Sequence, residues 1–331
     1  MRPIGGYFEL ELAQRNSYHP TAIALNTGRN CLEYILRVRG YSRVYIPYYT
    51  CDVILEPFKK LGINYTFYHI NLNLEIGDDI TLGANEALLY TNYFGLKQDY
   101  TATLASKYGK QLIVDNTQAF FAKPFAGIDT FYTCRKFFGV ADGAYLYCDQ
   151  PLDMKLEQDH SWNRMDYLLK RIDLSPEDGY ADFQSNELLL SNLPIRRMSA
   201  LTERIMASID YDSVAQHRRD NYIILDDSLR STNNIELPLT DEAIPMVYPY
   251  LTEDSDLRQK LIDNKIFVAK YWPNVQEWTN SIDSVESFFT NKLLPLPVDQ
   301  RYGTDEWIKL KHLLNHESCT HRWHRNSNSY C

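Results

Sequence analysis

The stretch "DNTQAFFAKPFAGIDTFYTCRKFFGVADGAYL", from Asp115 to Leu146, sets polar groups into an otherwise apolar segment. Asp115 closes the apolar run "QLIVDN", and Gln118 follows it by three residues. Lys136 comes after a second β-rich run and precedes a glycine-containing turn with the pair Asp142-Gly143. Ligands of open α/β sheets bind at the carboxyl ends of the strands. This stretch therefore predicts a site at a strand end.

Short apolar runs and helical patterns alternate on either side of this stretch. Strand-like runs occupy residues 44–47, 63–70, 86–95, 111–116 and 143–148, and helical patterns occupy residues 51–62 and 99–110. Gly62 provides a helix stop. The alternation predicts an α/β fold with a mostly parallel sheet and helices on both faces.

The pattern changes after about residue 150. Residues 151–171 and 185–232 are rich in helical pattern, with a break expected at Pro194. A second α+β unit follows, with strands expected at 244–251 and 266–272 and helices at 254–264 and 304–315. We expect a large domain over residues 1–209, whose first segment can pack elsewhere, and a smaller C-terminal α+β domain over residues 210–331.

Composition narrows the class of protein. The 331 residues are 44% apolar, which is enough for a large core, and the net charge of -9 argues against a nucleic-acid or anionic-membrane surface. No run reaches the about 18 apolar residues of a membrane helix, and the first residues lack the apolar core of a signal peptide. We expect a cytoplasmic protein.

The six cysteines show no CxxC pairing, which favours free thiols in a reducing compartment. The C-terminal tail contains four potential metal ligands, His316, Cys319, His321 and His324. Their spacing matches no zinc pattern, so no metal site is predicted.

A pyridoxal phosphate site requires a lysine for the aldehyde and a carboxylate for the pyridine nitrogen. Lys136 can hold the aldehyde, Asp115 can pair with the pyridinium, and Gln118 can donate to the ring hydroxyl. Thr133, three residues before the lysine, can contact the phosphate.

Such a site also needs backbone amides for the phosphate, which a helix start supplies. "LNTGRNCLEYIL" (residues 25–36) places Gly28 at the opening of an amphipathic helix, with the amides of Arg29 and Asn30 free to face an anion. Each feature also has a plain interpretation, as a turn former, a surface lysine or an ordinary helix entry. Their order and spacing together favour the site.

The same motifs resemble the fold-type-I pyridoxal phosphate enzymes, and most closely the DegT/StrS family of sugar aminotransferases. The matching segments, in chain order over about residues 20–315, are "NTGRNCLE", "PYYTC", "DNTQAFF", "RKFFGVADGA", "IRRMSALTERI" and "LPLPVDQRY". They stand for a Gly-Thr helix start, P-x-x-T-F/W, D-x-A-Q, a lysine before G-E/D-G-G, N-x-R-M and L-P-L-H/P.

The resemblance implies a transaminase with pyridoxal 5'-phosphate as its cofactor. Asp115 would then pair with the ring nitrogen, Gln118 would contact the ring hydroxyl, and Lys136 would be the Schiff-base lysine. The implied reaction moves an amino group from glutamate to a keto-sugar, nucleotide-linked, for surface polysaccharide or amino-sugar biosynthesis. The resemblance also implies a homodimer that acts on small molecules and has no nucleic-acid or membrane partner.

The chain departs from the family pattern at three positions of the cofactor site. Cys51 stands where the family has its ring-stacking aromatic, a role that Tyr49 or Tyr93 can take instead. Ile195 replaces the asparagine of N-x-R-M, and Phe131 replaces a serine that contacts phosphate. These departures either tune the site or abolish its activity.

Five arginines and one tyrosine are candidates for substrate binding. Arg196 and Arg197 can bind acceptor phosphates across a dimer interface or can be ordinary surface charges, and Arg218 and Arg219 have the same two interpretations. Arg135 can orient the donor carboxylate, because a guanidinium suits that geometry. Tyr93 can contact substrate, and residues 270–273, "KYWP", place aromatic rings near the cleft or in a plain strand of the small domain.

Two other functions remain open at this point. The Asp115, Gln118 and Lys136 set also fits elimination, desulfuration or aldol cleavage on the same cofactor. A non-catalytic scaffold of the same fold is the other alternative, although the retained Lys136 argues against it.

Overall fold

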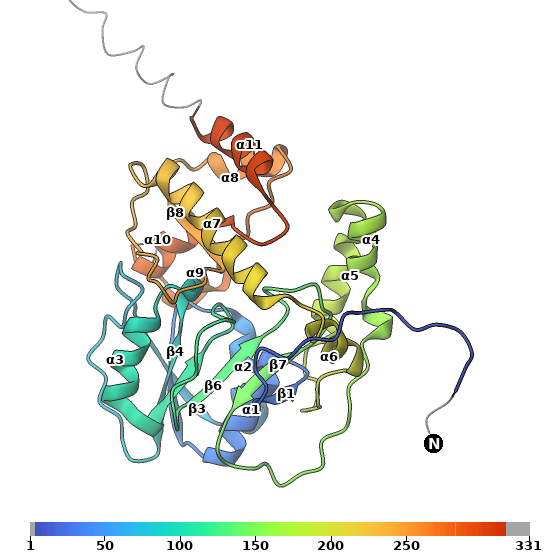
Figure 1. Cartoon of the computed structure of the whole chain (residues 1–331). Coiled ribbons are helices and arrows are strands. Elements are labelled where there is room, and N and C mark those ends of the chain that lie inside the picture. The colour runs from blue at the N-terminus through green and yellow to red at the C-terminus, as the bar shows by residue number, and fades with distance from the viewer. Residues whose placement is uncertain (1–3, 282, 316–331) are drawn as a thin grey trace, which may run out of the picture.

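The computed structural model describes residues 4–281 and 283–315 (Figure 1). Its largest element is a seven-stranded sheet in the order β1-β7-β6-β5-β4-β2-β3. The strands are β1 (Ile23–Leu25), β2 (Arg43–Pro47), β3 (Asn64–Tyr68), β4 (Glu86–Thr91), β5 (Leu112–Asp115), β6 (Asp129–Thr133) and β7 (Ala144–Tyr147). The neighbours from β3 to β6 run parallel, whereas β7 is antiparallel to both β6 and β1. The predicted α/β fold with a mostly parallel sheet is confirmed.

Alternating side chains supply both faces of this sheet. Ala87 and Leu89 pack with helices α1 (Gly28–Arg39) and α2 (Leu55–Leu61), whereas Leu88 and Tyr90 pack with α3 (Gln98–Tyr108) and the second unit. A strand with both faces buried reads as a continuous apolar run, as "EALLYT" does. Short 3-10 turns lie at Asp52–Ile54, Tyr93–Gly95, Gly109–Gln111 and Trp162–Arg164.

A helical region follows β7. It contains α4 (Asp166–Asp173), α5 (Pro176–Leu189) and α6 (Ala200–Met206), and the α4–α5 hairpin stands beside the sheet in Figure 1. The expected break at Pro194 is confirmed, since α5 has ended and the chain forms bridges through Arg197 to Leu25 and Gln158 before α6 begins.

The second unit is built on a two-stranded antiparallel sheet of β8 (Val247–Leu251) and β9 (Leu293–Pro297). Around it lie α7 (Tyr211–Leu229), α8 (Leu257–Asp263), α9 (Asn274–Thr279), α10 (Val285–Lys292) and α11 (Thr304–Asn315). Figure 1 shows this yellow-to-red unit above the large sheet, with α7 descending from the unit toward the sheet. The domain boundary at residues 209/210 stays a prediction.

The predicted strand at 266–272 is wrong. The Arg258 guanidinium donates to the carbonyls of Val268 and Ala269, and the Ile266 amide closes α8 by donating to the Leu261 carbonyl at 2.8 Å. The segment's main-chain groups are therefore used by α8 rather than by a strand ladder.

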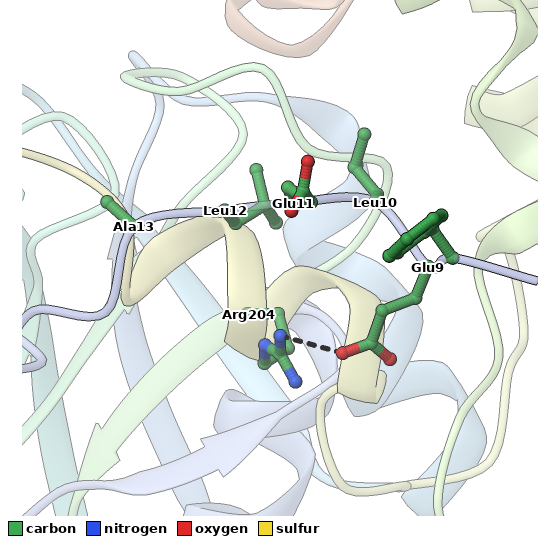
Figure 2. Close-up of a pocket in the computed structure, with 7 residues that line it drawn as sticks. Glu9, Leu10, Glu11, Leu12, Ala13 and Arg204 are labelled. Carbon is green, nitrogen blue, oxygen red and sulfur yellow. Dashed lines mark hydrogen bonds and ion pairs between the residues drawn. The ribbon is translucent and has the colours of Figure 1, made fainter. Parts of the chain in front are cut away.

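The described N-terminal arm lies extended over α6 (Figure 2). Glu9 accepts from Arg204 at 3.1 Å, and Phe8–Ala13 with Arg204 line a hollow of about 410 Å³. Both charged side chains are solvent-exposed, so this ion pair adds little stability. The hollow includes none of the predicted cofactor residues. No described helix has the length and apolar character needed to span a membrane.

Candidate cofactor site

Asp115 is the last residue of β5 and lies inside the sheet, in register with Thr91 of β4 and Phe131 of β6. Only 6% of the residue is exposed. Burial raises the pKa of Asp115, and the nearby Lys136 cation opposes that shift. The Thr117 amide donates to Asp115 Oδ1 at 2.8 Å and further favours the carboxylate.

Lys136 lies just past the end of β6, beside the strand that ends at Asp115. Its side chain is accessible from a cleft, and its Nζ donates to Thr117 Oγ1 at 3.2 Å. Desolvation of the amine by the protein around it lowers the pKa of Lys136, and the charge of Asp115 opposes this shift. The two predicted catalytic groups are thus electrostatic neighbours, joined through Thr117.

The N-terminus of α1 adjoins the same pair. Thr27 Oγ1 caps the helix by accepting from the Asn30 amide at 3.1 Å, so the amides of Gly28 and Arg29 are those left without a helical partner. A Cβ on Gly28 would lie 3.4 Å from Thr117 Cγ2, which shows how closely the helix end approaches the strand ends. The positive end of the helix dipole therefore faces the acid–lysine pair.

Gln118 is fully buried, and its amide oxygen is already used. Its Oε1 accepts from the Phe94 amide at 2.9 Å, so the amide nitrogen is the end that can donate to a ligand. Phe94 takes a left-handed conformation, with φ of 58°, at the turn where this contact forms.

The cleft at Lys136 has a volume of about 210 Å³ and is walled by the second unit. Its lining includes Arg218, Phe267, Tyr271, Pro297 and Asp299. The prediction that "KYWP" brings an aromatic ring to the cleft is confirmed by Tyr271.

The backbone that follows Lys136 is held from two sides. Phe137 O accepts from Gln300 Nε2 at 3.0 Å and from the Arg218 guanidinium at 3.4 Å, and Arg218 Nε donates to Gln300 Oε1 at 3.0 Å. Arg218 is 1% exposed, and its guanidinium also lies 4.6 Å from the Phe137 ring centroid. Arg218 therefore makes its contacts inside the protein, and its interpretation as a surface charge is wrong.

Cys51 is half-buried near the site. Burial raises the pKa of its thiol, and the Lys136 cation opposes the shift. The two tyrosines that can replace the ring-stacking aromatic are both fully buried, and Tyr93 donates its hydroxyl to Tyr49 O at 2.9 Å. The structure thus brings Cys51 to the lysine but does not bring Tyr93 to the cleft surface.

Thr133 is the last residue of β6, half-buried and paired through its backbone with Ala144. Phe131, at the family's serine position, is buried, with a ring atom 3.8 Å from the Cβ that Gly28 would carry. The phosphate role of Thr133 stays a prediction. Ile195, at the family's asparagine position, is 4% exposed and belongs to the apolar core.

The side chains that flank the helix start turn away from the acid–lysine pair. Asn30 is buried and donates to Asn26 Oδ1 at 2.7 Å and to Pro194 O at 2.8 Å. Arg29 donates to Glu56 Oε2 at 3.2 Å and to Leu190 O at 3.1 Å. A cofactor contribution from Arg29 would come from its main chain.

The predicted substrate arginines are engaged within their own chain. Arg135 pairs with Glu187 of α5, although it directly precedes Lys136. Arg196 donates to Asp159 at 3.3 Å, and Arg197 donates to Gln158 at 2.6 Å. The structure does not bring these three guanidinium groups to the cleft, and phosphate binding across a dimer interface stays a prediction.

Two groups at the site have no counterpart among the predicted residues. Thr117 contacts both Asp115 and Lys136, and Gln300 donates a hydrogen bond to the backbone carbonyl that follows the lysine. The signal for Thr117 was the hydroxyl in "DNTQ", at the alanine of D-x-A-Q. Gln300 carries no local signal, because it reaches the site only through the tertiary fold.

The fold is similar to that of solved aminotransferases, and the likeness concerns the fold alone. No family profile and no curated protein sequence matches the chain. Among solved structures, it is similar to a DegT/DnrJ/EryC1/StrS aminotransferase from Brucella abortus, with 15% identity, coverage of 89% of this chain and 85% of that chain, and a TM-score of 0.59.

Two further solved structures show the same likeness. DesV of S. venezuelae is 18% identical, with coverage of 90% of this chain and 84% of that chain and a TM-score of 0.62. A sugar aminotransferase of Streptococcus pneumoniae in its PLP form is 15% identical, with coverage of 91% and 88% and a TM-score of 0.63.

Proposed function

We propose that this chain is a pyridoxal phosphate-dependent aminotransferase and a divergent relative of the DegT/StrS sugar aminotransferases. The observation that carries the proposal is the convergence of Asp115, Lys136 and the N-terminus of α1, with Thr117 bonded to the first two and its methyl group 3.4 Å from the position of a Cβ on Gly28. The solved structures support it, since those from Brucella abortus and Streptococcus pneumoniae are described as aminotransferases.

The residues present fit the cofactor. The Lys136 amine would take the aldehyde carbon, the Asp115 carboxylate the ring nitrogen, and the Gln118 amide the ring hydroxyl. The amides of Gly28 and Arg29, with the Thr133 hydroxyl, would hold the phosphate. The lack of a Cβ at Gly28 permits the close approach that such a cradle needs. When bound, the cofactor supplies an electron sink for the carbanion formed at a substrate carbon.

The chain's own groups would supply the proton transfer. Lys136 must be neutral to take a proton from the α-carbon of an amino donor. The desolvation that lowers its pKa increases the fraction of the amine that is neutral. Asp115 must stay ionised to keep a ring nitrogen protonated, and the Thr117 amide favours its charged form. Asp115 is buried, which keeps water from its carboxylate, whereas the cleft is open to Lys136.

We propose glutamate as the amino donor and a nucleotide-linked keto-sugar as the acceptor, for surface polysaccharide or amino-sugar biosynthesis. The sugar aminotransferases among the solved structures support this substrate class. We also propose a homodimer in the cytoplasm. The α4–α5 hairpin supports a second copy, because it exposes large apolar side chains, including Leu169, Ile172 and Leu188.

The test begins with cofactor binding. Protein mixed with pyridoxal phosphate should gain visible absorbance that borohydride removes, leaving a reduced adduct on the Lys136 peptide in mass spectrometry. Lys136→Ala should show neither, whereas Lys123→Ala, which removes an exposed lysine, should behave as the wild type. A wild type that never takes up the cofactor would favour the scaffold interpretation.

The reaction class is tested next. Glutamate with a panel of nucleotide-linked keto-sugars should release 2-oxoglutarate, and the aminated sugar should appear in equal amount. A loaded protein that instead releases sulfide, ammonia or an aldehyde from an amino acid, with no aminated acceptor, would assign it to desulfuration, elimination or aldol cleavage.

A further inference from the structure

Thr117 lies at the meeting point of the three parts of the candidate site. Its main-chain amide donates to Asp115 Oδ1 at 2.8 Å, and its hydroxyl accepts from Lys136 Nζ at 3.2 Å. Its methyl group is the atom closest to the Cβ that Gly28 would carry, at 3.4 Å. The residue therefore contacts Asp115 and Lys136 and lies beside the start of α1.

These contacts fix the orientation of the side chain. Threonine is branched at Cβ and has few χ1 positions, and the rotamer seen here turns the methyl group toward the start of α1 and the hydroxyl toward Lys136. The hydroxyl faces the cleft side, where the Lys136 amine reaches it.

The hydroxyl also acts on the acid. Burial raises the pKa of Asp115, and the side-chain hydrogen bond from Thr117 is among the contacts that oppose it. A hydroxyl can accept one hydrogen bond while it donates another. Thr117 can therefore accept from the Lys136 amine and donate to the Asp115 carboxylate in one arrangement.

We propose that Thr117 is a positioning residue for Lys136, whose hydroxyl holds the free amine beside Asp115 and favours its protonated form. An ammonium group donates a stronger hydrogen bond than a neutral amine, so an acceptor at this position stabilises the charged state. The inference deepens the proposed function. It rests on that function only for the catalytic role of the amine, and not for the hydrogen bond itself.

A plain packing role is the competing explanation, and two substitutions separate it. Thr117→Val keeps the branched shape and the methyl contact with α1 but removes the hydroxyl. Thr117→Ser keeps the hydroxyl and removes the methyl group. Thr117→Ala removes both the hydroxyl and the methyl group and adds no apolar group beside the carboxylate. It replaces the valine variant in the experiment if that variant does not fold. Thermal unfolding identifies the folded variants.

The experiment follows the reactivity of Lys136 in cofactor-free protein. Trace acetic anhydride labels amines in their neutral form, and mass spectrometry of the Lys136 peptide gives the rate at each pH. The exposed Lys123 in the same sample corrects for loss of reagent.

We expect Thr117→Val or Thr117→Ala to shift the midpoint of Lys136 labelling down by about 0.5 to 1 pH unit, a three- to tenfold gain in neutral amine near pH 7, as for the loss of one charge-assisted hydrogen bond. Thr117→Ser should stay within about 0.3 unit of the wild type, because it keeps the acceptor.

Two results would overturn the proposal: an unchanged midpoint in the variants without a hydroxyl, or a serine variant that shifts as far as they do. The labelling needs neither cofactor nor substrate. A protein that fails to transaminate can therefore still confirm the role of Thr117, and an active enzyme can still refute it.

Discussion

The buried imidazole of His19 makes the stability of this protein depend on pH. His19 is 3% exposed and packs among the rings of Tyr18, Phe120, Tyr132 and Tyr145. Its Nε2 lies 2.9 Å from Phe120 O, which can only accept, so this nitrogen carries the proton. Its Nδ1 then accepts from the Tyr147 hydroxyl at 3.1 Å. The neutral imidazole satisfies both contacts.

The direction and size of the effect follow from this geometry. Burial lowers the pKa of His19 from 6.5 to about 4. Between these values the unfolded chain binds a proton that the folded chain refuses, so stability falls as pH falls. The slope is about 1.4 kcal/mol per pH unit, and the full loss is about 3 kcal/mol below the folded pKa. The contribution is constant above pH 6.5.

Urea unfolding at about pH 7 and about pH 5 measures this effect, because His19 should account for a loss of about 2 kcal/mol between them. In His19→Gln the amide can still donate toward Phe120 O but does not titrate. The variant should therefore lose about 2 kcal/mol less than the wild type over this interval, whatever its absolute stability. His160→Gln, at an exposed loop position, removes one imidazole without touching the cluster and is the matched control. Equal losses in wild type and His19→Gln would refute the reasoning.

Two further predictions concern buried carboxylates that stabilise the fold. Arg39→Ala should lower the free energy of unfolding by about 3 to 5 kcal/mol, because Asp129 is 2% exposed and accepts two hydrogen bonds from Arg39 at 2.7 Å each. Urea titration measures this loss. The reasoning is contradicted if adding Asp129→Asn to Arg39→Ala recovers none of it. Asp142→Asn should cost about 1.5 to 3 kcal/mol, because Asp142 accepts from the Ser199 amide at 2.9 Å, the Ser199 hydroxyl at 2.7 Å and the Thr202 hydroxyl. An unchanged urea midpoint for Asp142→Asn would show that the capping of α6 does not need the charge.

The large sheet was predictable because its information is local. Each strand from β2 to β5 is a short run of apolar, aromatic or β-branched residues, and the alternation of such runs with helices along most of this region favours a parallel sheet. Asp115 and Lys136 were paired in the sequence because a pyridoxal phosphate site needs both groups, and the structure places Asp115 at the end of β5 and Lys136 just past the neighbouring β6. The short β1 strand was not predicted, because three residues at a sheet edge carry little pattern of their own.

The direction of side chains beside the site was not predictable. Arg135 and Lys136 are adjacent in sequence, yet one pairs with Glu187 of α5 and the other reaches Thr117. Sequence placed a guanidinium near the lysine, but the α5 hairpin decides where it points. The segment 266–272 failed for a related reason, since its strand-like composition is overridden by the hydrogen bonds that Arg258 makes to its carbonyls.

The position of Lys136 depends on both units of the chain. The carbonyl of the next residue, Phe137, accepts from Arg218 of α7 and from Gln300, which follows β9. Arg218 also donates to Met246 O at 3.1 Å, just before β8, so it contacts both strands of the small sheet at the end where Val247 pairs with Pro297. A displacement of the small sheet would pull on the backbone that carries the amine, while Asp115 stays fixed in the large sheet. Substitutions at Arg218 or Gln300 should therefore disturb Lys136 while leaving Asp115 in place in the large sheet.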